Sequence, residues 1–287
     1  MSESPKPTHR PDDVSVAYQL RCHFGFPTYR RQPKFTDELI PVASEALQRI
    51  ANQNELHLLE FAFLPHVLRC LVSLRSIDAP ERVARTIKGN FTAALRPHGV
   101  AELWSRGTFV RSNGNVDDAT ISSYLAKQWG HHRDVPERNP DFVIPCHYES
   151  GLDPSELRHS SHCVFQYNVH FVFSVSRRAR VLDPTISKNL IEYWRRLCES
   201  RGWMVWSIAC VGDHAHMMLG LGLGDSPMDV ALSLMNNSEY VFQKQNMSLF
   251  KEFGLDSLWS RGFYAGTVGA ATTEQIARYL ENQRDLA

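Results

Sequence analysis

The clearest chemistry-bearing pattern in the chain is a pair of histidines, His214 and His216, separated by one alanine. The segments 203–211 and 214–221 are predicted strands on either side of Gly212-Asp213, a dipeptide that favours a tight hairpin. Strand side chains alternate between faces, so residues two apart project together and two imidazoles could hold one divalent ion. Because the chain has 13 histidines, such a pair arises by chance about half the time. The pair is informative only in its context.

A tyrosine and a glutamine near the C-terminus add to this pattern. Tyr279 and Gln283 are four apart in a predicted helix at about 272–285, so they share one helix face. A glutamine amide oxygen is a further hard ligand, and a tyrosine beside a metal can act as a covalent nucleophile. Mg²⁺ or Mn²⁺ would polarise a phosphate oxygen and disperse the charge that develops as the tyrosine attacks phosphorus. On its position alone, Tyr279 is more simply explained as a packed helix aromatic.

An internal repeat organises the chain. Residues 103–128 and 258–283 align without a gap at an offset of 155, with ten identities in 26 positions. Both segments begin with Leu-Trp-Ser-Arg-Gly and end with Tyr-Leu-x-x-Gln. Chance would give only about one or two identities over this length. We therefore infer a true duplication.

Each copy has the same predicted order of elements, β-α-β-β-α-β-α. In the second copy the predictions are a strand at 163–176, a helix at 184–201, strands at 203–211 and 214–221, a helix at about 227–246, a strand at about 259–268 and the helix at about 272–285. In the first copy they are a strand at 16–26, a helix at 37–53, strands at 56–63 and 66–74, a helix at 78–95, a strand at 103–111 and a helix at 116–129. This order predicts α+β units, each a mainly antiparallel sheet with helices on one face.

The repeat also sets the expected domain boundaries. Residues 1–15 form a polar N-terminal tail, 16–129 the first domain and 161–287 the second. The range 130–160 is polar and carries four prolines, which predicts a linker. Its histidines and Cys146 fit no trusted zinc template, and solvated linker residues explain them better. A linker of about thirty residues gives two like units ample reach to pack against each other.

Composition limits the remaining classes of function. Hydrophobic residues make up 43% of the 287 residues and charged residues 22%, as in ordinary globular proteins. We expect no membrane span, because no apolar stretch approaches about 18 residues, and no secretion signal. Six scattered cysteines suit a reducing compartment, so a cytoplasmic location is expected. The net charge is zero, and a DNA-binding surface must therefore come from local basic clusters.

Taken together, these features resemble the single-tyrosine HUH transposases, and most closely the REP-associated tyrosine transposases. The resemblance covers 163–285 and, more faintly, 16–129. The segments that carry it are Tyr167-Asn-Val-His-Phe-Val-Phe with Arg177-Arg178, Gly212-Asp-His-Ala-His216, Leu258-Trp-Ser-Arg-Gly-Phe-Tyr and Tyr279-Leu-Glu-Asn-Gln283. The resemblance implies two tandem ferredoxin/RRM-like HUH domains packed as a pseudo-dimer, with the first domain degenerate.

The same resemblance implies a reaction and a site. Members of this family cut single-stranded DNA near hairpins, form a 5′-phosphotyrosine link and leave a free 3′-hydroxyl. By this likeness His214, His216 and Gln283 would bind Mg²⁺ or Mn²⁺, and Tyr279 would be the nucleophile. The expected partner is single-stranded or hairpin DNA, and the resemblance therefore implies a nucleoid-associated location in the cytoplasm.

The first copy departs from the family pattern but keeps part of it. Its equivalent strand is aligned as Leu64-Pro-His-Val-Leu-Arg69, which places Leu68 at the second histidine, so no metal centre is expected there. It retains Tyr124 and Gln128, which could complete the second copy's site in trans. We expect Tyr279 and Gln283 to act in cis, in either a monomeric pseudo-dimer or a homodimer.

Basic residues in both copies are candidate phosphate contacts, each adding to a salt-dependent affinity. They are Arg30, Arg31, Lys88, Arg106, Arg177, Arg178, Arg180 and Arg261. The first copy could thus serve as a DNA-grip module. The alternative function is a catalytically silent DNA-hairpin-binding protein derived from such a transposase, which the neutral charge and the broken site favour. A third, more distant hypothesis is that the chain is an ordinary α+β protein in which the histidine pair is incidental.

Overall fold

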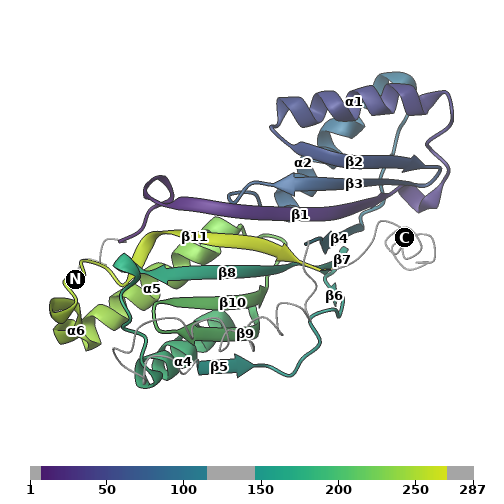
Figure 1. Cartoon of the computed structure of the whole chain (residues 1–287). Coiled ribbons are helices and arrows are strands. Elements are labelled where there is room, and N and C mark those ends of the chain that lie inside the picture. The colour runs from purple at the N-terminus through teal and green to yellow at the C-terminus, as the bar shows by residue number, and fades with distance from the viewer. Residues whose placement is uncertain (1–7, 115–145, 270–287) are drawn as a thin grey trace, which may run out of the picture.

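The computed structural model describes residues 8–114 and 146–269 (Figure 1). The first copy consists of β1 (Ser15–Pro27), α1 (Leu39–Gln53), β2 (His57–Leu64), β3 (Val67–Leu74), α2 (Pro80–Leu95) and β4 (Thr108–Ser112). The second copy consists of β7 (Cys163–Gln166), β8 (Asn168–Val175), α4 (Pro184–Arg201), β9 (Met204–Val211), β10 (His214–Gly220), α5 (Pro227–Gln245), α6 (Met247–Glu252) and β11 (Trp259–Val268). Short 3₁₀ helices include η1 (Pro11–Asp13), η2 (Tyr29–Arg31), η3 (Arg96–His98) and η6 (Ser176–Arg178).

The predicted β-α-β-β-α-β order is confirmed in both copies, whereas the predicted helices at 116–129 and 272–285 lie outside the described residues. Local chemistry explains the helix ends of the second copy. The Asp183 side chain accepts a hydrogen bond from the Ile186 N–H at 2.7 Å and caps α4, which ends at Gly202 with φ of 72°. Ser226 caps α5 in the same way.

The predicted strand at 163–176 is divided into β7, which pairs with β4, and β8, which pairs with β10 and β11. Two further predicted ranges also differ from the structure. The first copy's last strand begins at Thr108 rather than 103, because residues 105–107 turn their carbonyls toward Lys88 instead of a neighbouring strand. The range expected as linker contains two short strands where it is described, β5 (Cys146–Glu149) and β6 (Arg158–His159). These strands satisfy the backbone groups at the edges formed by β9 and β7.

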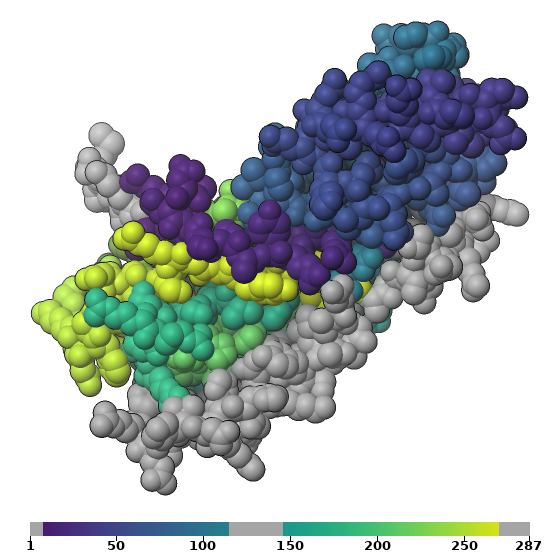
Figure 2. Space-filling view, turned by 45° about the horizontal axis from the view of Figure 1, so that its top comes forward, coloured from purple at the N-terminus to yellow at the C-terminus, as the bar shows by residue number. Residues whose placement is uncertain are grey.

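The described strands form one eleven-stranded sheet, with the order β5-β9-β10-β8-β11-β1-β4-β7-β6 and with β3 and β2 added beside β1. Pairing inside each copy is antiparallel, as predicted. Pairing between the copies is parallel: β1 pairs with β11, and β4 pairs with β7. The first strand of each copy therefore lies against the last strand of the other. Figure 2 shows the first part of β1 running along β11.

Two hydroxyl side chains, Ser112 and Thr267, form hydrogen bonds between the copies that are reciprocal in the same way as the strand pairing. They are separated by the repeat offset of 155 residues. Each accepts a hydrogen bond from a backbone N–H of the other copy, in β8 or β1, and donates one to a carbonyl near the end of the other copy's last strand. The bonds run from Asn168 N to Ser112 Oγ (3.2 Å), from Ser112 Oγ to Val268 O (2.6 Å), from Arg21 N to Thr267 Oγ1 (2.9 Å) and from Thr267 Oγ1 to Asn113 O (2.6 Å). We call this pair the hydroxyl clamp.

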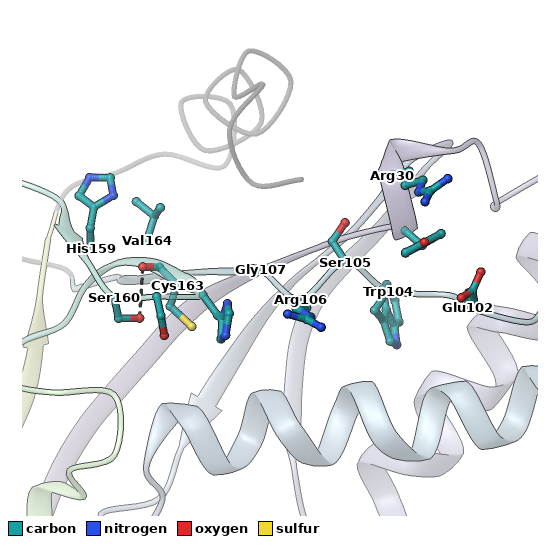
Figure 3. Close-up of a pocket in the computed structure, with 13 residues that line it drawn as sticks. Arg30, Glu102, Trp104, Ser105, Arg106, Gly107, His159, Ser160, Cys163 and Val164 are labelled. Atoms are coloured by element: carbon teal, nitrogen blue, oxygen red, sulfur yellow. Dashed lines mark hydrogen bonds between the residues drawn. The ribbon is translucent and has the colours of Figure 1, made fainter.

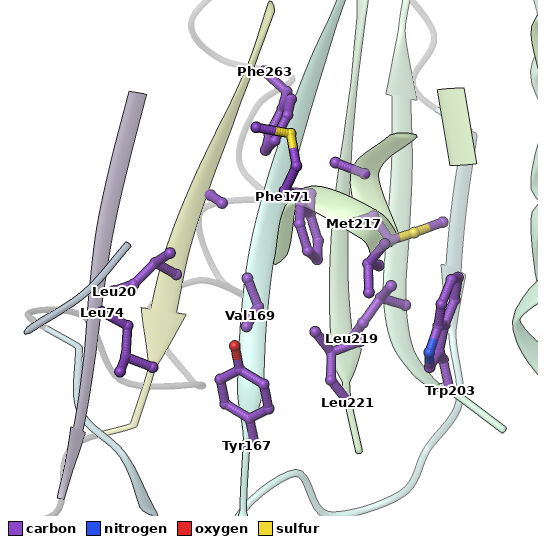
Figure 4. Close-up of a cluster of buried hydrophobic side chains, with 14 of the residues drawn as sticks. Leu20, Leu74, Tyr167, Val169, Phe171, Trp203, Met217, Leu219, Leu221 and Phe263 are labelled. Atoms are coloured by element: carbon purple, nitrogen blue, oxygen red, sulfur yellow. The ribbon is translucent and has the colours of Figure 1, made fainter. Parts of the chain in front are cut away.

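The hydrophobic core is continuous across the two copies. In the second copy, Phe173 packs on Trp194 of α4 and on Trp259, so one sheet face is covered by helices. Figure 4 shows Leu20 and Leu74 of the first copy beside Val169 of the second, within one buried cluster. No helix within residues 8–114 and 146–269 has both the length and the apolar character needed to cross a membrane.

Candidate functional site

The histidine pair lies on the face of the second copy's sheet that the helices do not cover. Ala215 and Met217 of β10 point into the core, so His214 and His216 project from the opposite face, as the spacing predicted. Their ring centroids are 5.0 Å apart and the rings meet edge to face. Both side chains are buried, with 6% and 5% of their surface exposed.

A third histidine, His170 of β8, completes this group. Its Nε2 lies 3.1 Å from Nδ1 of His216, and the two rings are stacked at 5.2 Å with an interplanar angle of 8°. Burial lowers the pKa of His170 to about 4, so the ring is neutral near pH 7. Either ring can be the donor in this pair, depending on the tautomers. Sequence reasoning assigned His170 no role, although His23 at the same place in the first copy could have pointed to it.

An aspartate in the preceding turn orients the first histidine. The Oδ1 atom of Asp213 lies 2.6 Å from Nδ1 of His214, and its Oδ2 lies 3.0 Å from Nε of Arg178. Burial by itself would raise the pKa of Asp213, but the hydrogen bond from His214 and the positive charges of His214, Arg178 and Arg180 lower it below its ordinary value. A carboxylate bonded to one ring nitrogen fixes the tautomer and the ring orientation of a metal-binding histidine.

A tyrosine of β11 also lies on this face. The ring centroid of Tyr264 is 6.1 Å from that of His170. The Tyr264 hydroxyl lies over Gly266, where a Cβ atom would overlap it, so only glycine leaves room for the ring in this position. Tyr264 lies in one of the segments that carry the family resemblance, and the sequence predicts no role for it. It is a second tyrosine to consider beside the predicted nucleophile.

The remaining predicted members of the site are Tyr279, Gln283, Tyr124 and Gln128, and all four lie outside the described residues. Within residues 8–114 and 146–269, no group of three or more His, Cys, Asp or Glu side chains is arranged to hold a metal ion. The two imidazoles His214 and His216 still fit a divalent ion as part of a larger set, because each uses Nδ1 for a protein partner and would bind through Nε2.

The structure corrects the predicted equivalence between the two copies. β1 pairs Phe24 with Cys70, and β8 pairs Phe171 with Met217, so matching strands are 147 residues apart. At this offset His214 corresponds to Val67 and His216 to Arg69, not to His66 and Leu68 as the sequence alignment proposed. Leu68 belongs to the core face, since a one-residue shift moves a strand residue to the other face. Both positions of the candidate histidine pair are thus occupied by other residues in the first copy.

The same paired basic turn occurs beside the site in both copies. Arg30 and Arg31 adopt left-handed backbone angles, with φ of 51° and 53°, and Arg177 and Arg178 repeat this with φ of 54° each. Non-glycine residues in this region are uncommon and carry local strain, which is typical of functional positions. We expected all four to contact phosphates. Arg30, Arg177 and Arg178 are exposed, and Arg31 is partly buried.

The other predicted phosphate contacts are placed differently. Arg106 and Arg261 are exposed at equivalent positions of the two Leu-Trp-Ser-Arg-Gly sequences, and Arg180 is half-buried. Lys88 is used inside the protein instead: its Nζ donates to the carbonyls of Ser105 (2.7 Å), Arg106 (3.2 Å) and Gly107 (3.1 Å). Burial lowers the pKa of Lys88. Its ammonium therefore holds the loop that presents Arg106.

Fold and site together define a duplicated α+β protein with a buried histidine group on the sheet face opposite the described helices of one copy. A family model described as "Transposase IS200 like" matches residues 16–128 and again residues 163–283. The two matches cover most of the chain, which belongs to the IS200-like transposase family. The double match also confirms the tandem duplication.

The curated relatives are about one copy long. The ISDra2 transposase TnpA of Deinococcus radiodurans is 24% identical over 132 residues, which cover 46% of this chain and 94% of that protein. The transposase for insertion sequence element IS200 of Salmonella typhimurium is 25% identical over 130 residues, or 43% of this chain and 80% of that protein. A solved structure of a candidate transposase from Deinococcus radiodurans is 22% identical, with a TM-score of 0.32, over 39% of this chain and 92% of that one.

Proposed function

We propose that this transposase-family protein is a metal-dependent endonuclease and strand transferase that acts on single-stranded DNA near hairpins. The observation that carries the proposal is the pair His214 and His216, buried on one sheet face and oriented by Asp213 and His170. Gln283 would add an amide oxygen to the two imidazoles, and the bound Mg²⁺ or Mn²⁺ would polarise the scissile phosphate. The family match does not favour the alternative of a silent hairpin-binding protein.

The proposed reaction needs no external energy source. The deprotonated oxygen of Tyr279 attacks phosphorus, the bond from phosphorus to the 3′-oxygen breaks, and that oxygen takes up a proton to become a 3′-hydroxyl. The product is a 5′-phosphotyrosine link, whose energy is kept for rejoining to another 3′-hydroxyl. The Arg178 guanidinium, bound to Asp213 at the edge of the site, is placed to attract the phosphate backbone.

We further propose that the chain works as a covalent pseudo-dimer with one metal site. The reciprocal pairing of β1 with β11 and of β4 with β7 supports this, because each copy uses the same two strands toward the other. The first copy, with Val67 and Arg69 at the ligand positions, would contribute DNA contacts rather than a second metal centre. We propose that Tyr279 is the nucleophile and acts in cis, and that Tyr124 acting in trans is the alternative.

A labelled hairpin with single-stranded flanks, incubated with the protein and Mn²⁺, tests the proposal on a denaturing gel. We expect a covalent protein–DNA adduct that disappears with EDTA, with His216→Ala and with Tyr279→Phe, and that persists in Tyr124→Phe. Tyr264→Phe is the matched control, because it removes a tyrosine hydroxyl from the same sheet face. If the adduct is lost in Tyr124→Phe alone, Tyr124 is the nucleophile and acts in trans. If it is lost in Tyr264→Phe alone, Tyr264 of β11 is the nucleophile.

The orientation of His214 has its own test. Asp213→Asn keeps a polar partner for the ring but removes the negative charge, so we expect Mn²⁺ to bind about 10-fold more weakly. Isothermal titration with Mn²⁺ in the absence of DNA measures this effect. Arg178→Gln breaks the other contact of Asp213 and serves as the control, with Mn²⁺ affinity nearly unchanged. Equal affinity in wild type and Asp213→Asn would contradict the proposed role.

A further inference from the structure

A hollow of about 780 Å³ opens on the first copy, away from the histidine group. Three segments line it: the turn at Tyr29 and Arg30, the loop at residues 102–107 and the segment at residues 159–164 that enters the second copy (Figure 3). The last segment is held in place because the Thr108 N–H donates to the His162 carbonyl at 3.0 Å and β4 pairs with β7. We call this hollow the connector groove, since the chain between the copies forms one of its walls.

The charges around the connector groove favour an anion. Arg30 and Arg106 line it and are exposed, while Glu102 is the single carboxylate among its described lining residues. Lys88 adds a positive charge beneath the loop whose carbonyls it binds. His159 and His162 are exposed on the opposite wall and add ring donors.

Aromatic surface lies next to these charges. The Arg30 guanidinium stands over the Tyr29 ring at 5.0 Å, and the half-buried Trp104 forms part of the floor. Cations interleaved with aromatic rings are the usual means of holding single-stranded nucleic acid, with phosphates on the cations and bases on the rings. The groove combines both kinds of group, and Lys88 donates hydrogen bonds to the loop that carries Trp104 and Arg106.

The corresponding place in the second copy holds a buried carboxylate and is covered by another segment of the chain. There α5 carries Glu239, which accepts hydrogen bonds from the backbone N–H groups of Leu258 and Trp259. The segment before β1 covers it: His9 is 2% exposed, donates its N–H to Asn236 at 2.8 Å and places its Nε2 3.8 Å from Glu239. A buried carboxylate that is covered by another segment of the chain does not attract a phosphate. The two copies therefore differ here as sharply as at the histidine positions.

We propose that the connector groove binds a segment of single-stranded DNA, with backbone phosphates on Arg30 and Arg106. The proposal rests on the proposed DNA function and adds a site on the copy without a metal centre. DNA held there would be positioned by the first copy while the second copy cuts.

Cys163 provides a direct probe. It lines the groove and is half-buried, whereas the other five cysteines are buried. We expect a twenty-nucleotide oligo(dT), in EDTA to prevent cleavage, to slow the alkylation of Cys163 by N-ethylmaleimide several-fold, as measured by mass spectrometry. In fluorescence anisotropy, Arg30→Gln and Arg106→Gln should each weaken oligo(dT) binding and lower the salt dependence by about one phosphate contact.

Arg96→Gln is the matched control, an exposed arginine of the same copy that does not line the groove. It should leave both readouts unchanged, and melting temperatures should show that all variants fold. Oligo(dT) that binds without protecting Cys163, or with the same salt slope in both groove variants, would overturn the proposal, as would a failure of wild type to bind. The adduct assay separates the two ideas. An adduct without protection of Cys163 would contradict only the proposed DNA binding in the connector groove. Protection of Cys163 without an adduct would contradict only the proposed nuclease activity.

Discussion

At the residue scale, the two copies place different chemistry on equivalent strands. His170 stacks on His216 in the second copy, while in the first copy His23 has Arg69 at the corresponding position. Burial and the positive charges of Arg69 and Arg111 lower the pKa of His23 to about 4. The Asn113 amide, 2.9 Å from Nε2 of His23, suits the neutral ring. The first copy therefore keeps a neutral histidine beside an arginine where the second copy has two stacked histidines.

This depressed pKa predicts how stability depends on pH. The unfolded chain protonates His23 near its ordinary pKa of 6.5, whereas the folded chain does so only near 4. Its contribution to folding is therefore complete above pH 6.5 and is lost as the pH falls toward 4, by about 2 kcal/mol. Urea unfolding at pH 7.5 and 4.5 should show a smaller pH effect in His23→Gln than in wild type. An identical pH effect in both proteins would contradict the prediction.

The residues of the candidate site were only partly predictable from the sequence. His214 and His216 were found from their spacing, because a two-residue interval on a strand fixes a shared face. His170 was missed because its contact with His216 depends on the register between β8 and β10, which no local pattern specifies. Lys88 was assigned to phosphate because a sequence does not show that three nearby carbonyls will bind its ammonium.

At the element scale, the helices and strands were largely predictable, since each follows a clear hydrophobic period with caps or turns at its ends. The alignment of β3 with β10 was wrong by one residue, because a histidine at position 66 resembled the ligand pair although it lies in the turn before β3. The strands β5 and β6 were not predicted, because they are short and gain stability only from the edges that they cover.

The hydroxyl clamp makes the junction between the copies testable. Ser112→Ala leaves the Asn168 N–H and the Val268 carbonyl without their buried partner, so we expect the free energy of unfolding to fall by about 1–3 kcal/mol. Thr267→Val, which preserves shape, should cost a similar amount for the equivalent reason. Urea denaturation measures both effects. Ser200→Ala on the exposed side of α4 is the control, and a loss no larger than in this control would contradict the prediction.

At the scale of the whole molecule, the shared sheet and core predict that the copies do not unfold separately. Leu20 of the first copy and Val169 of the second belong to one buried cluster, and β1 pairs with strands of both copies. Differential scanning calorimetry should therefore show one transition, with the calorimetric and van't Hoff enthalpies about equal. Two resolved transitions in wild type would show that the copies are independent domains.

How the copies join was the part of the fold least accessible to the sequence. The duplication was visible from identities between residues 103–128 and 258–283, but nothing in those residues indicates that β4 would pair with β7 in parallel. Pairing between copies depends on long-range backbone contacts, which any strand with a suitable edge can make.

The reciprocal junction has a consequence for how such a chain can evolve. In an assembly of two identical chains, every substitution appears twice, so a change that ruins one metal site ruins both. Once the halves are encoded in tandem, Val67 and Arg69 can occupy one side while the other side carries His214 and His216. Residues at the junction cannot change independently in this way, because the Ser112 and Thr267 hydroxyls each form hydrogen bonds with the other copy. Gene fusion thus lets the equivalent sheet faces of the two copies change independently. The junction between the copies cannot change in this way, because each half depends on residues of the other.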